Sequence, residues 1–197
     1  LASSNPGKLA EFNQLFADVG LAVVAQASLG VADADETGLT FIENALLKAR
    51  HAAAVTGLPA LADDSGICVD HLRGAPGLYS ARYSGGHGDS AANNAKLLRE
   101  MESVPEARRG AFFICVLALV RHADDPAPLI AEGRWHGRVL DAPRGPGGFG
   151  YDPLFLPGGL AQSAAELDPA TKNRLSHRGQ ALAVLHARLA GWQRDRT

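Results

Sequence analysis

An unbroken apolar run at residues 111–120, AFFICVLALV, constrains the fold of this chain more than any other feature. Its β-branched and aromatic side chains are typical of a buried strand. The turn formers Asp124, Asp125 and Pro126 follow it, and a second strand-like stretch covers residues 129–140. We therefore expect these two stretches to pair as a hairpin within a sheet.

Strand-like and helical patterns alternate along the rest of the chain. Thr40 and Glu43 form a capping-box pattern at the start of a helix that Gly57 and Pro59 end. Strands interleaved with helices predict an α/β fold, a mixed β-sheet with flanking helices. The remaining expected elements are helices at 9–19, 91–101, a short helix opened by Asp168 and Pro169, a helix at 176–191, and strands at 21–25 and 58–62.

Length and composition limit the class of protein. The 197 residues are 46% hydrophobic and contain no repeat or linker, so we expect one domain over residues 1–197. A net charge of -2 without a long basic run argues against binding to nucleic acid. No apolar stretch is long enough for a membrane helix, and the first residues do not form a signal peptide. We expect the beginning of a first strand to precede Leu1.

The cysteines Cys68 and Cys115 lie in apolar surroundings and lack the spacing of a metal or redox motif. We expect buried free thiols, which indicate a reducing compartment and hence a cytoplasmic protein. A disulfide is the weaker alternative.

Two adjacent carboxylates, Asp63 and Asp64, follow the apolar run 58–62 and precede Ser65 and Gly66. Neighbouring side chains inside a strand point to opposite faces, but a turn at the strand end can bring both carboxylates together. We expect such a turn, which would form a site for a hard divalent cation. Ordinary turn chemistry is the alternative, since all four residue types favour turns.

The segment from Ser3 to Lys8 offers hydroxyls, a glycine, free helix amides and a lysine, which are the parts of a phosphate cradle. It is not a Walker A loop, because the first glycine is absent and Leu9 stands where the metal-binding hydroxyl would be. A capped helix with a solvated lysine is the alternative.

Asn44 and Lys48 lie four residues apart and share one face of the helix that begins after Thr40. Lys48 can therefore point toward a ligand or into water. Glu36, in the preceding loop, could add a third carboxylate to those of Asp63 and Asp64, although an exposed glutamate is the commoner case.

Residues 145–150 match the letters of the dinucleotide fingerprint G-x-G-x-x-G, but no strand precedes them and no helix follows. We reject that interpretation. The loop presents Phe149, which can stack on a base, beside Asp152, which can accept hydrogen bonds from ring N–H groups. A glycine turn with a Phe anchored in the core is the alternative.

His177 and Arg178 occupy the first turn of a helix, where the macrodipole favours acidic side chains. A bound anionic or carbonyl-bearing ligand would offset this, and Lys172 adds another donor one turn earlier. Cations that simply extend into water are the alternative, because the dipole penalty is only about 0.3 to 1 kcal/mol.

Taken together, these segments resemble the inosine triphosphate pyrophosphatase family over nearly the whole chain. The family hydrolyses non-standard purine nucleoside triphosphates, such as dITP, ITP and XTP, to the monophosphate and pyrophosphate. Its fold is a long mixed sheet forming two lobes around a substrate cleft, usually as a homodimer. The matching segments are residues 3–8, 36–45 with 48–49, 62–66, 76–83, 148–153, 164–167 with Lys172, and 176–179.

The resemblance implies a role for each matching residue. Asp64 matches the proton acceptor and a magnesium ligand, Glu36 and Asp63 match the other metal-site carboxylates, and manganese is expected to substitute for magnesium. The implied substrate contacts are Ser3, Ser4, Asn5, Pro6, Gly7, Lys8 and Lys48 for the triphosphate, Ser65, and Phe149, Gly150, Tyr151, Asp152, Lys172, His177 and Arg178 for the base.

Two other functions use some of the same residues. A magnesium phosphohydrolase that releases orthophosphate would also need paired aspartates and lysines, but not Phe149 beside Asp152. A regulatory module that only binds a nucleotide would not need the carboxylates of Glu36, Asp63 and Asp64. The anion released from ITP distinguishes all three.

Overall fold

A computed structural model describes residues 1–2, 12–13, 16, 22–86 and 88–194. Its sheet has the strand order β1-β2-β3-β4. Strands β3 and β4 are antiparallel, with Gly137 opposite Pro157. The strands are β1 (Ala60–Val69), β2 (Gly110–Val120), β3 (Leu129–Val139) and β4 (Phe155–Pro157).

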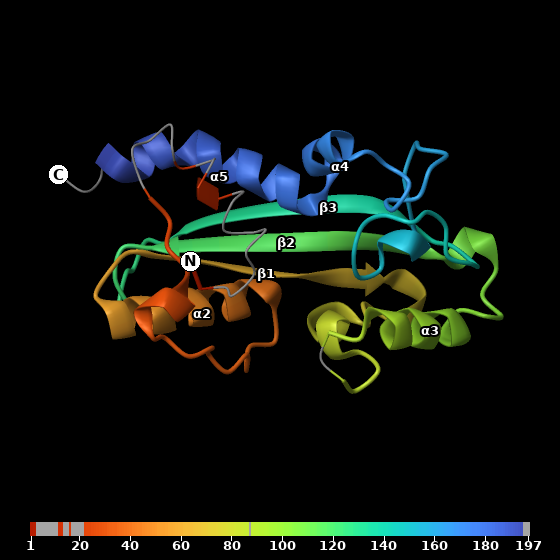
Figure 1. Cartoon of the computed structure of the whole chain (residues 1–197), viewed down its shortest axis with the longest axis horizontal. Helices are drawn as coiled ribbons and strands as arrows, with labels where there is room; N and C mark the ends of the chain where they lie inside the picture. The colour runs from red at the N-terminus through yellow and green to blue at the C-terminus, as the bar shows by residue number, and fades with distance from the viewer. Residues whose placement is uncertain (3–11, 14–15, 17–21, 87, 195–197) are drawn as a thin grey trace. The chain divides into compact units, whose positions relative to one another are not determined.

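Helices flank these strands (Figure 1). The α-helices are α2 (Phe41–Thr56), α3 (Ser90–Glu100), α4 (Pro169–Leu175) and α5 (His177–Arg194). Short 3-10 helices cover Gln26–Leu29, Asp70–Leu72, Gly77–Arg82, Glu106–Arg108 and Asp152–Leu154. Within the described residues, no helix is long and apolar enough to cross a membrane.

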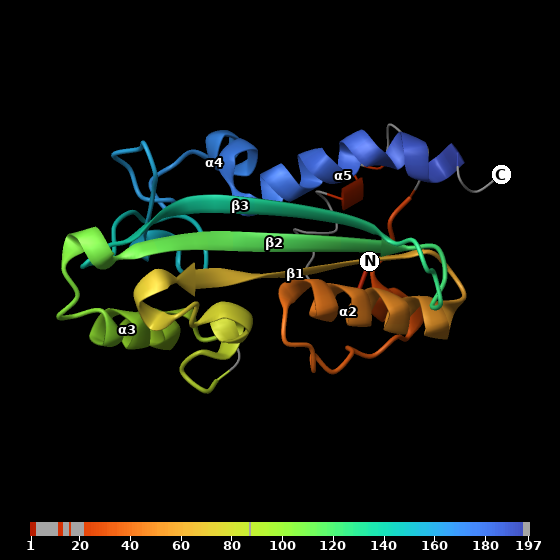
Figure 2. The ribbon, with the colours of Figure 1, turned by 180° about the vertical axis from the view of Figure 1, so that it is seen from behind.

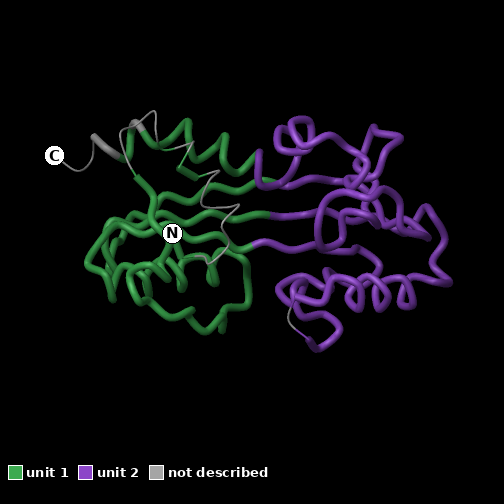
Figure 3. Tube along the Cα trace, in the orientation of Figure 1, with its two compact units in different colours: residues 1–64, 115–133, 180–197 green, residues 65–114, 134–179 purple. Residues whose placement is uncertain are grey.

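The chain divides into two compact units, drawn in different colours in Figure 3. Unit 1 comprises residues 1–64, 115–133 and 180–197, and unit 2 comprises residues 65–114 and 134–179. The prediction that residues 1–197 act as one domain stays a prediction.

In unit 1, helices α2 and α5 lie on opposite sides of the strands, as both views show (Figures 1 and 2). Leu61 of β1 belongs to a buried cluster with residues of α5, among them Leu185 and Leu189. Helix α2 buries small residues, and Ala45 and Ala49 are fully inaccessible. Each face of the unit 1 strands is thus covered by a helix.

Local sequence signals set the start and end of α2. The Thr40 hydroxyl accepts from the backbone N–H of Glu43 at 3.2 Å, and the Glu43 carboxylate accepts from the N–H of Leu39 at 2.8 Å. These bonds satisfy free N–H groups at the helix start. Gly57 ends the helix in the left-handed conformation. The predicted helix start is confirmed with Thr40 as its cap, although Glu43 accepts from the residue before the cap.

Unit 2 has its own core, in which Phe113, Trp135 and Phe155 pack together. The Phe113 and Phe155 rings meet edge to face with centroids 4.7 Å apart. Tyr151 and Leu154, which follow the glycine loop, are buried in the same cluster. The core therefore anchors the loop at its carboxyl end.

The predicted α/β class, the adjacent strands β2 and β3, and the helices at 91–101 and after Asp168 are confirmed. Cys68 and Cys115 are buried free thiols, as expected. Other expectations were wrong: α5 continues through Gly191 to Arg194, and residues 22–25 are not in the expected strand. The helix predicted at 9–19 lies largely outside the described residues, although Phe12 and Phe16 are helical and buried.

Candidate active site

The two aspartates lie in the middle of strand β1, which continues through Ser65 and Gly66 to Val69. The prediction that the strand ends at residue 62 and turns there was wrong. The preference of serine and glycine for turns is weak compared with the stabilisation that a strand gains by pairing within a sheet. The tertiary context therefore determines the conformation of Ser65 and Gly66. Asp63 and Asp64 are therefore not brought together by a turn.

Asp64 faces helix α2, because its carboxylate contacts two side chains of that helix. The Lys48 ammonium donates to Oδ1 of Asp64 at 2.9 Å, and the Asn44 amide contacts Oδ2 at 3.4 Å. Alternation along the strand places Asp63 on the other face, which Leu61 shares. Both carboxylates are buried, with residue exposures of 4% for Asp63 and 9% for Asp64.

Lys48 joins two of the predicted carboxylates. Its ammonium donates to Oε1 of Glu36 at 2.7 Å as well as to Asp64. Glu36 comes from the loop before α2, Lys48 from α2 and Asp64 from β1, so three segments of unit 1 meet at one cation. The sequence placed Asn44 and Lys48 on one helix face, and this is confirmed. Lys48 therefore does not extend freely into water.

Burial and the neighbouring charges shift the pKa values of Asp64 and Lys48 in opposite directions. Burial raises the pKa of the Asp64 carboxyl, and the nearby Lys48 ammonium only partly opposes that rise. Burial lowers the pKa of Lys48, but the carboxylates of Asp64 and Glu36 outweigh it, so the pKa of Lys48 is raised overall. Asp64 is thus a desolvated carboxylate, more basic than an exposed aspartate.

Among the described residues, no group of three or more His, Cys, Asp or Glu side chains is arranged to hold a metal ion. The structure brings Glu36 and Asp64 together around Lys48, but it does not bring Asp63 to them. The metal role of the three carboxylates stays a prediction. The segment predicted to contact the triphosphate, Ser3 to Lys8, lies outside the described residues, and Ser65 is half-buried in β1.

Unit 2 holds the second predicted group, around Phe149 of the glycine loop. The Phe149 ring is exposed (63%), whereas Asp152 is buried (3%). Oδ2 of Asp152 accepts from the Phe149 backbone N–H at 2.7 Å and forms an ion pair with Lys172. Lys172 also lies 4.5 Å from the centre of the Phe149 ring. Asp152 therefore fixes both the loop and the lysine, and Phe149 is not the core anchor that the alternative required.

Helix α5 begins with His177 and Arg178, whose side chains have different neighbours. The guanidinium carbon of Arg178 lies 5.7 Å from the centre of the Phe149 ring. The His177 ring is buried and stacks on Phe113, with centroids 4.8 Å apart and an interplanar angle of 11°. The structure thus gathers Lys172 and Arg178 at Phe149, while His177 packs into the core of unit 2.

Tyr151 and Gly150, also predicted to contact the base, have structural partners. The Tyr151 hydroxyl donates to the Ser80 carbonyl at 2.9 Å, and its ring belongs to the unit 2 core. The Gly150 carbonyl accepts from the Asn94 amide at 2.9 Å, and its φ of 59° is in the left-handed region that favours glycine. Sequence reasoning missed Asn94 and Ser80, and no signal in the sequence linked either residue to the loop.

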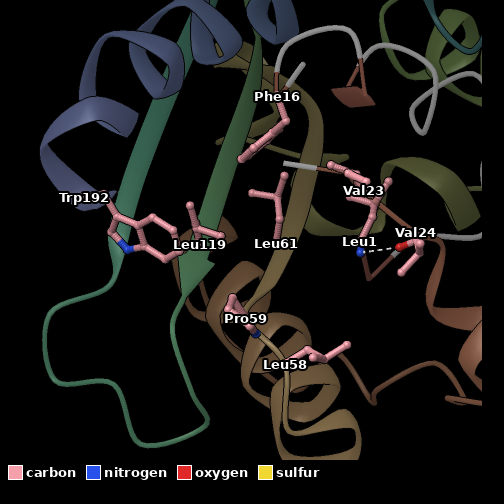
Figure 4. Close-up of a pocket in the computed structure, with 10 residues that line it drawn as sticks. Leu1, Phe16, Val23, Val24, Leu58, Pro59, Leu61, Leu119 and Trp192 are labelled. Carbon is pink, nitrogen blue, oxygen red and sulfur yellow. Dashed lines mark hydrogen bonds between the residues drawn. The ribbon is translucent and has the colours of Figure 1, made fainter. Parts of the chain in front are cut away.

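Unit 1 also contains an apolar cavity of about 210 Å³ (Figure 4). Leu1, Val23, Leu61, Leu119 and Trp192 are among the residues that line it. None of its lining residues belongs to the group formed by Glu36, Lys48 and Asp64, called here the acidic group. The cavity and the acidic group are therefore separate features.

Comparison with known proteins identifies the family to which this chain belongs. A family model described as the Ham1 family matches residues 1–188. The chain therefore belongs to the Ham1 family. This confirms the resemblance that the sequence motifs indicated.

Individual relatives agree with this assignment. A dITP/XTP pyrophosphatase from Ralstonia nicotianae is 62% identical over 192 residues, covering 96% of this chain and 94% of the relative. One from Xanthomonas campestris pv. campestris is 61% identical over 189 residues, covering 96% and 95%. Among solved structures, a HAM1 protein from Coxiella burnetii has a TM-score of 0.92 and 48% identity, covering 96% of each chain.

Proposed function

We propose that this chain hydrolyses non-canonical purine nucleoside triphosphates, dITP, XTP and ITP, to the monophosphate and pyrophosphate. The observation that carries the proposal is the buried Asp64 carboxylate, bound to Lys48 together with Glu36, in a chain 62% identical to a dITP/XTP pyrophosphatase. We propose that residues 1–197 act as one catalytic domain.

The donor set around Lys48 fits a hard divalent cation. It consists of carboxylate oxygens, and the contacts of the Lys48 ammonium with Glu36 and Asp64 demonstrate that these two carboxylates face a common positive charge. Magnesium keeps several waters and needs only one or two carboxylates besides substrate phosphates. Glu36 and Asp64 would hold it, with manganese as a substitute. When bound, the metal would neutralise phosphate charge.

Asp64 is the proposed general base. A carboxylate that accepts a proton from an attacking water works best when its pKa is raised toward the working pH, and burial raises the pKa of Asp64. Lys48 holds one oxygen of this carboxylate and supplies positive charge for the triphosphate. The proposed triphosphate contacts also include Ser3 to Lys8 and Ser65.

The Phe149 group of unit 2 is the proposed base-recognition element. The exposed Phe149 ring can stack on a purine, and Lys172 and Arg178 can donate to the carbonyl at position 6 of hypoxanthine or xanthine. Adenine has an amino group there, which would face these donors without a hydrogen bond. A site that depends on such bonds can reject the mismatched base by roughly 10⁴-fold.

The test is the anion released from ITP, dITP and XTP by purified protein with magnesium. Pyrophosphate and the nucleoside monophosphate are expected, with ATP as the poor substrate. Orthophosphate would instead indicate a phosphohydrolase, and tight binding without any hydrolysis would indicate a regulatory module.

The cellular compartment and the oligomeric state are proposed from fewer observations. The buried free thiols of Cys68 and Cys115 support a reducing, cytoplasmic compartment. The family resemblance supports a homodimer, for which light scattering of the purified protein is the test.

A further inference from the structure

We propose that Asn44 is a positioning residue that holds Asp64 and the loop carrying Glu36 in one fixed arrangement. Asn44 has one amide group with two ends, a donor and an acceptor, and each end contacts a different part of unit 1. Its side chain is buried, with a residue exposure of 2%. No role in the reaction was assigned to it from the sequence beyond sharing a helix face with Lys48.

The acceptor end holds the loop. Oδ1 of Asn44 accepts from the backbone N–H of Gly38 at 2.8 Å, and Gly38 follows Glu36 by two residues. The approach is so close that a Cβ on Gly38 would lie 2.7 Å from Oδ1 of Asn44 and 2.6 Å from Cβ of Glu43. The loop is therefore seated against the start of α2, and only glycine allows this distance.

The donor end contacts Asp64. Nδ2 of Asn44 lies 3.4 Å from Oδ2 of Asp64, while Lys48 occupies Oδ1 at 2.9 Å. Two donors on two oxygens restrict rotation of the carboxylate about its terminal torsion. The contact from Asn44 is long, so its main effect is on orientation.

The contacts close into a ring. Gly38 donates to Asn44, Asn44 to Asp64, and Lys48 to both Asp64 and Glu36, from which the backbone leads back to Gly38. Asn44 is the member that joins the loop to the strand without carrying charge. Catalytic groups need to be held within about 0.5 Å of their working positions by such supporting bonds.

The inference rests on the proposed function, since it assigns Asn44 to the same acidic group. It is tested with three variants assayed for pyrophosphate release from dITP, together with their melting temperatures. Asn44→Ala removes both ends of the amide. Asn44→Asp has the same shape and keeps an acceptor for Gly38, but loses the donor to Asp64. Gly38→Ala disturbs the loop contact from the other side.

Thr56→Val is the matched control on the same helix. Thr56 also has one donor contact, to the Ala52 carbonyl at 2.7 Å, and one acceptor contact, from the Leu58 N–H at 3.2 Å. It lies at the opposite end of α2 from Asn44 and has no contact with the acidic group. A loss of stability alone would therefore affect both variants alike.

We expect kcat of Asn44→Ala and Asn44→Asp to fall by about 10- to 100-fold, because small misplacements of reacting groups are costly. KM for dITP should change less than about threefold, because substrate contacts remain. Thr56→Val should keep kcat, whatever its melting temperature. Gly38→Ala should lower kcat, and adding Asn44→Ala to it should cost less than Asn44→Ala costs alone, since both variants remove the contact between Gly38 and Asn44.

The inference is overturned if both Asn44 variants, assayed well below their melting temperatures, turn over dITP at the parental rate. Strictly additive losses in the double variant would also overturn it. If Asn44→Ala does not fold, the same-shaped Asn44→Asp decides the question. A parent protein that releases no pyrophosphate from any of the three substrates would instead refute the proposed function, and the inference with it.

Discussion

Asp63 and Asp64 are adjacent in strand β1, yet regular alternation along the strand places their side chains on opposite faces of the sheet. Asp64 lies against α2, where Lys48 and Asn44 contact it. Asp63 shares its face with Leu61, which packs with residues of α5. The two carboxylates therefore have different surroundings, and substitutions at the two positions test different properties.

Asp64→Asn should keep the fold and nucleotide binding but lower turnover of dITP by about 10² to 10⁴-fold, because the amide cannot accept the proton. The amide has the shape of the carboxylate, so the melting temperature should change little. The measurements are kcat from pyrophosphate release and the thermal shift caused by nucleotide. Asp141→Asn, an exposed aspartate in a loop of unit 2, is the control and should leave kcat unchanged. Parental turnover in Asp64→Asn would show that another group accepts the proton.

Removal of metal should abolish activity. Glu36 and Asp64 offer oxygen ligands of the kind that magnesium and manganese accept. Dialysis against EDTA is therefore expected to stop pyrophosphate release, and added magnesium or manganese to restore it. Full activity after exhaustive chelation would leave Glu36, Asp64 and Lys48 as a structural ion-pair network.

Elements defined by local hydrogen bonds could be predicted from the sequence. The start of α2 depends on Thr40 and Glu43, which lie three residues apart, and the start of α4 depends on Asp168, whose side chain accepts from the N–H of Thr171. Such caps form between near neighbours, so their signal is contained in a short segment.

Features that depend on distant pairing could not be predicted. Residues 63–66 have turn-forming composition, but pairing within the sheet keeps them in β1. Strand β4 has only three residues and ends in Pro157, which leaves no periodicity to detect. The partners of Lys48, Glu36 and Asp64, lie 12 and 16 residues away, a distance over which helix spacing says nothing.

Two substitutions separate stacking from base discrimination. Phe149→Ala removes an exposed ring, so it should weaken binding of ITP and ATP alike, by about 1 to 3 kcal/mol. Its loss leaves Lys172 held by Asp152. Arg178→Ala removes a donor proposed to meet the 6-carbonyl, so it should reduce the ratio of kcat/KM for ITP over ATP. An unchanged ratio in Arg178→Ala would show that this arginine does not read the base.

The carboxylate of Asp168 should make the stability of unit 2 depend on pH. Its hydrogen bond from the Thr171 N–H lowers its pKa below the ordinary 3.8. A lowered pKa stabilises the folded state at pH values above 3.8, and this contribution is lost as the pH falls through the folded-state pKa. Asp168→Ala should therefore melt below the parent at neutral pH, and the difference should shrink in acid. A difference that is constant with pH would contradict this.

Gly179 sets how closely α5 follows α4. A Cβ at this position would lie 1.7 Å from the carbonyl oxygen of Asn173, a backbone atom that cannot rotate away. Gly179→Ala should therefore force the two helices apart and lower the free energy of unfolding by about 3 kcal/mol, as overpacking does. Lys172 and Arg178, on either side of this contact, would shift relative to Phe149, so KM for ITP should rise as well.

Gly191 is the matched control in the same helix, since a Cβ there would meet no atom of the described residues within 4 Å. Alanine favours a helix interior over glycine by about 1 kcal/mol, so Gly191→Ala should raise stability slightly and leave KM unchanged. Chemical denaturation of both variants measures the difference. If Gly179→Ala is as stable as Gly191→Ala and binds ITP normally, the close approach of α4 and α5 is not needed to place the base-recognition residues.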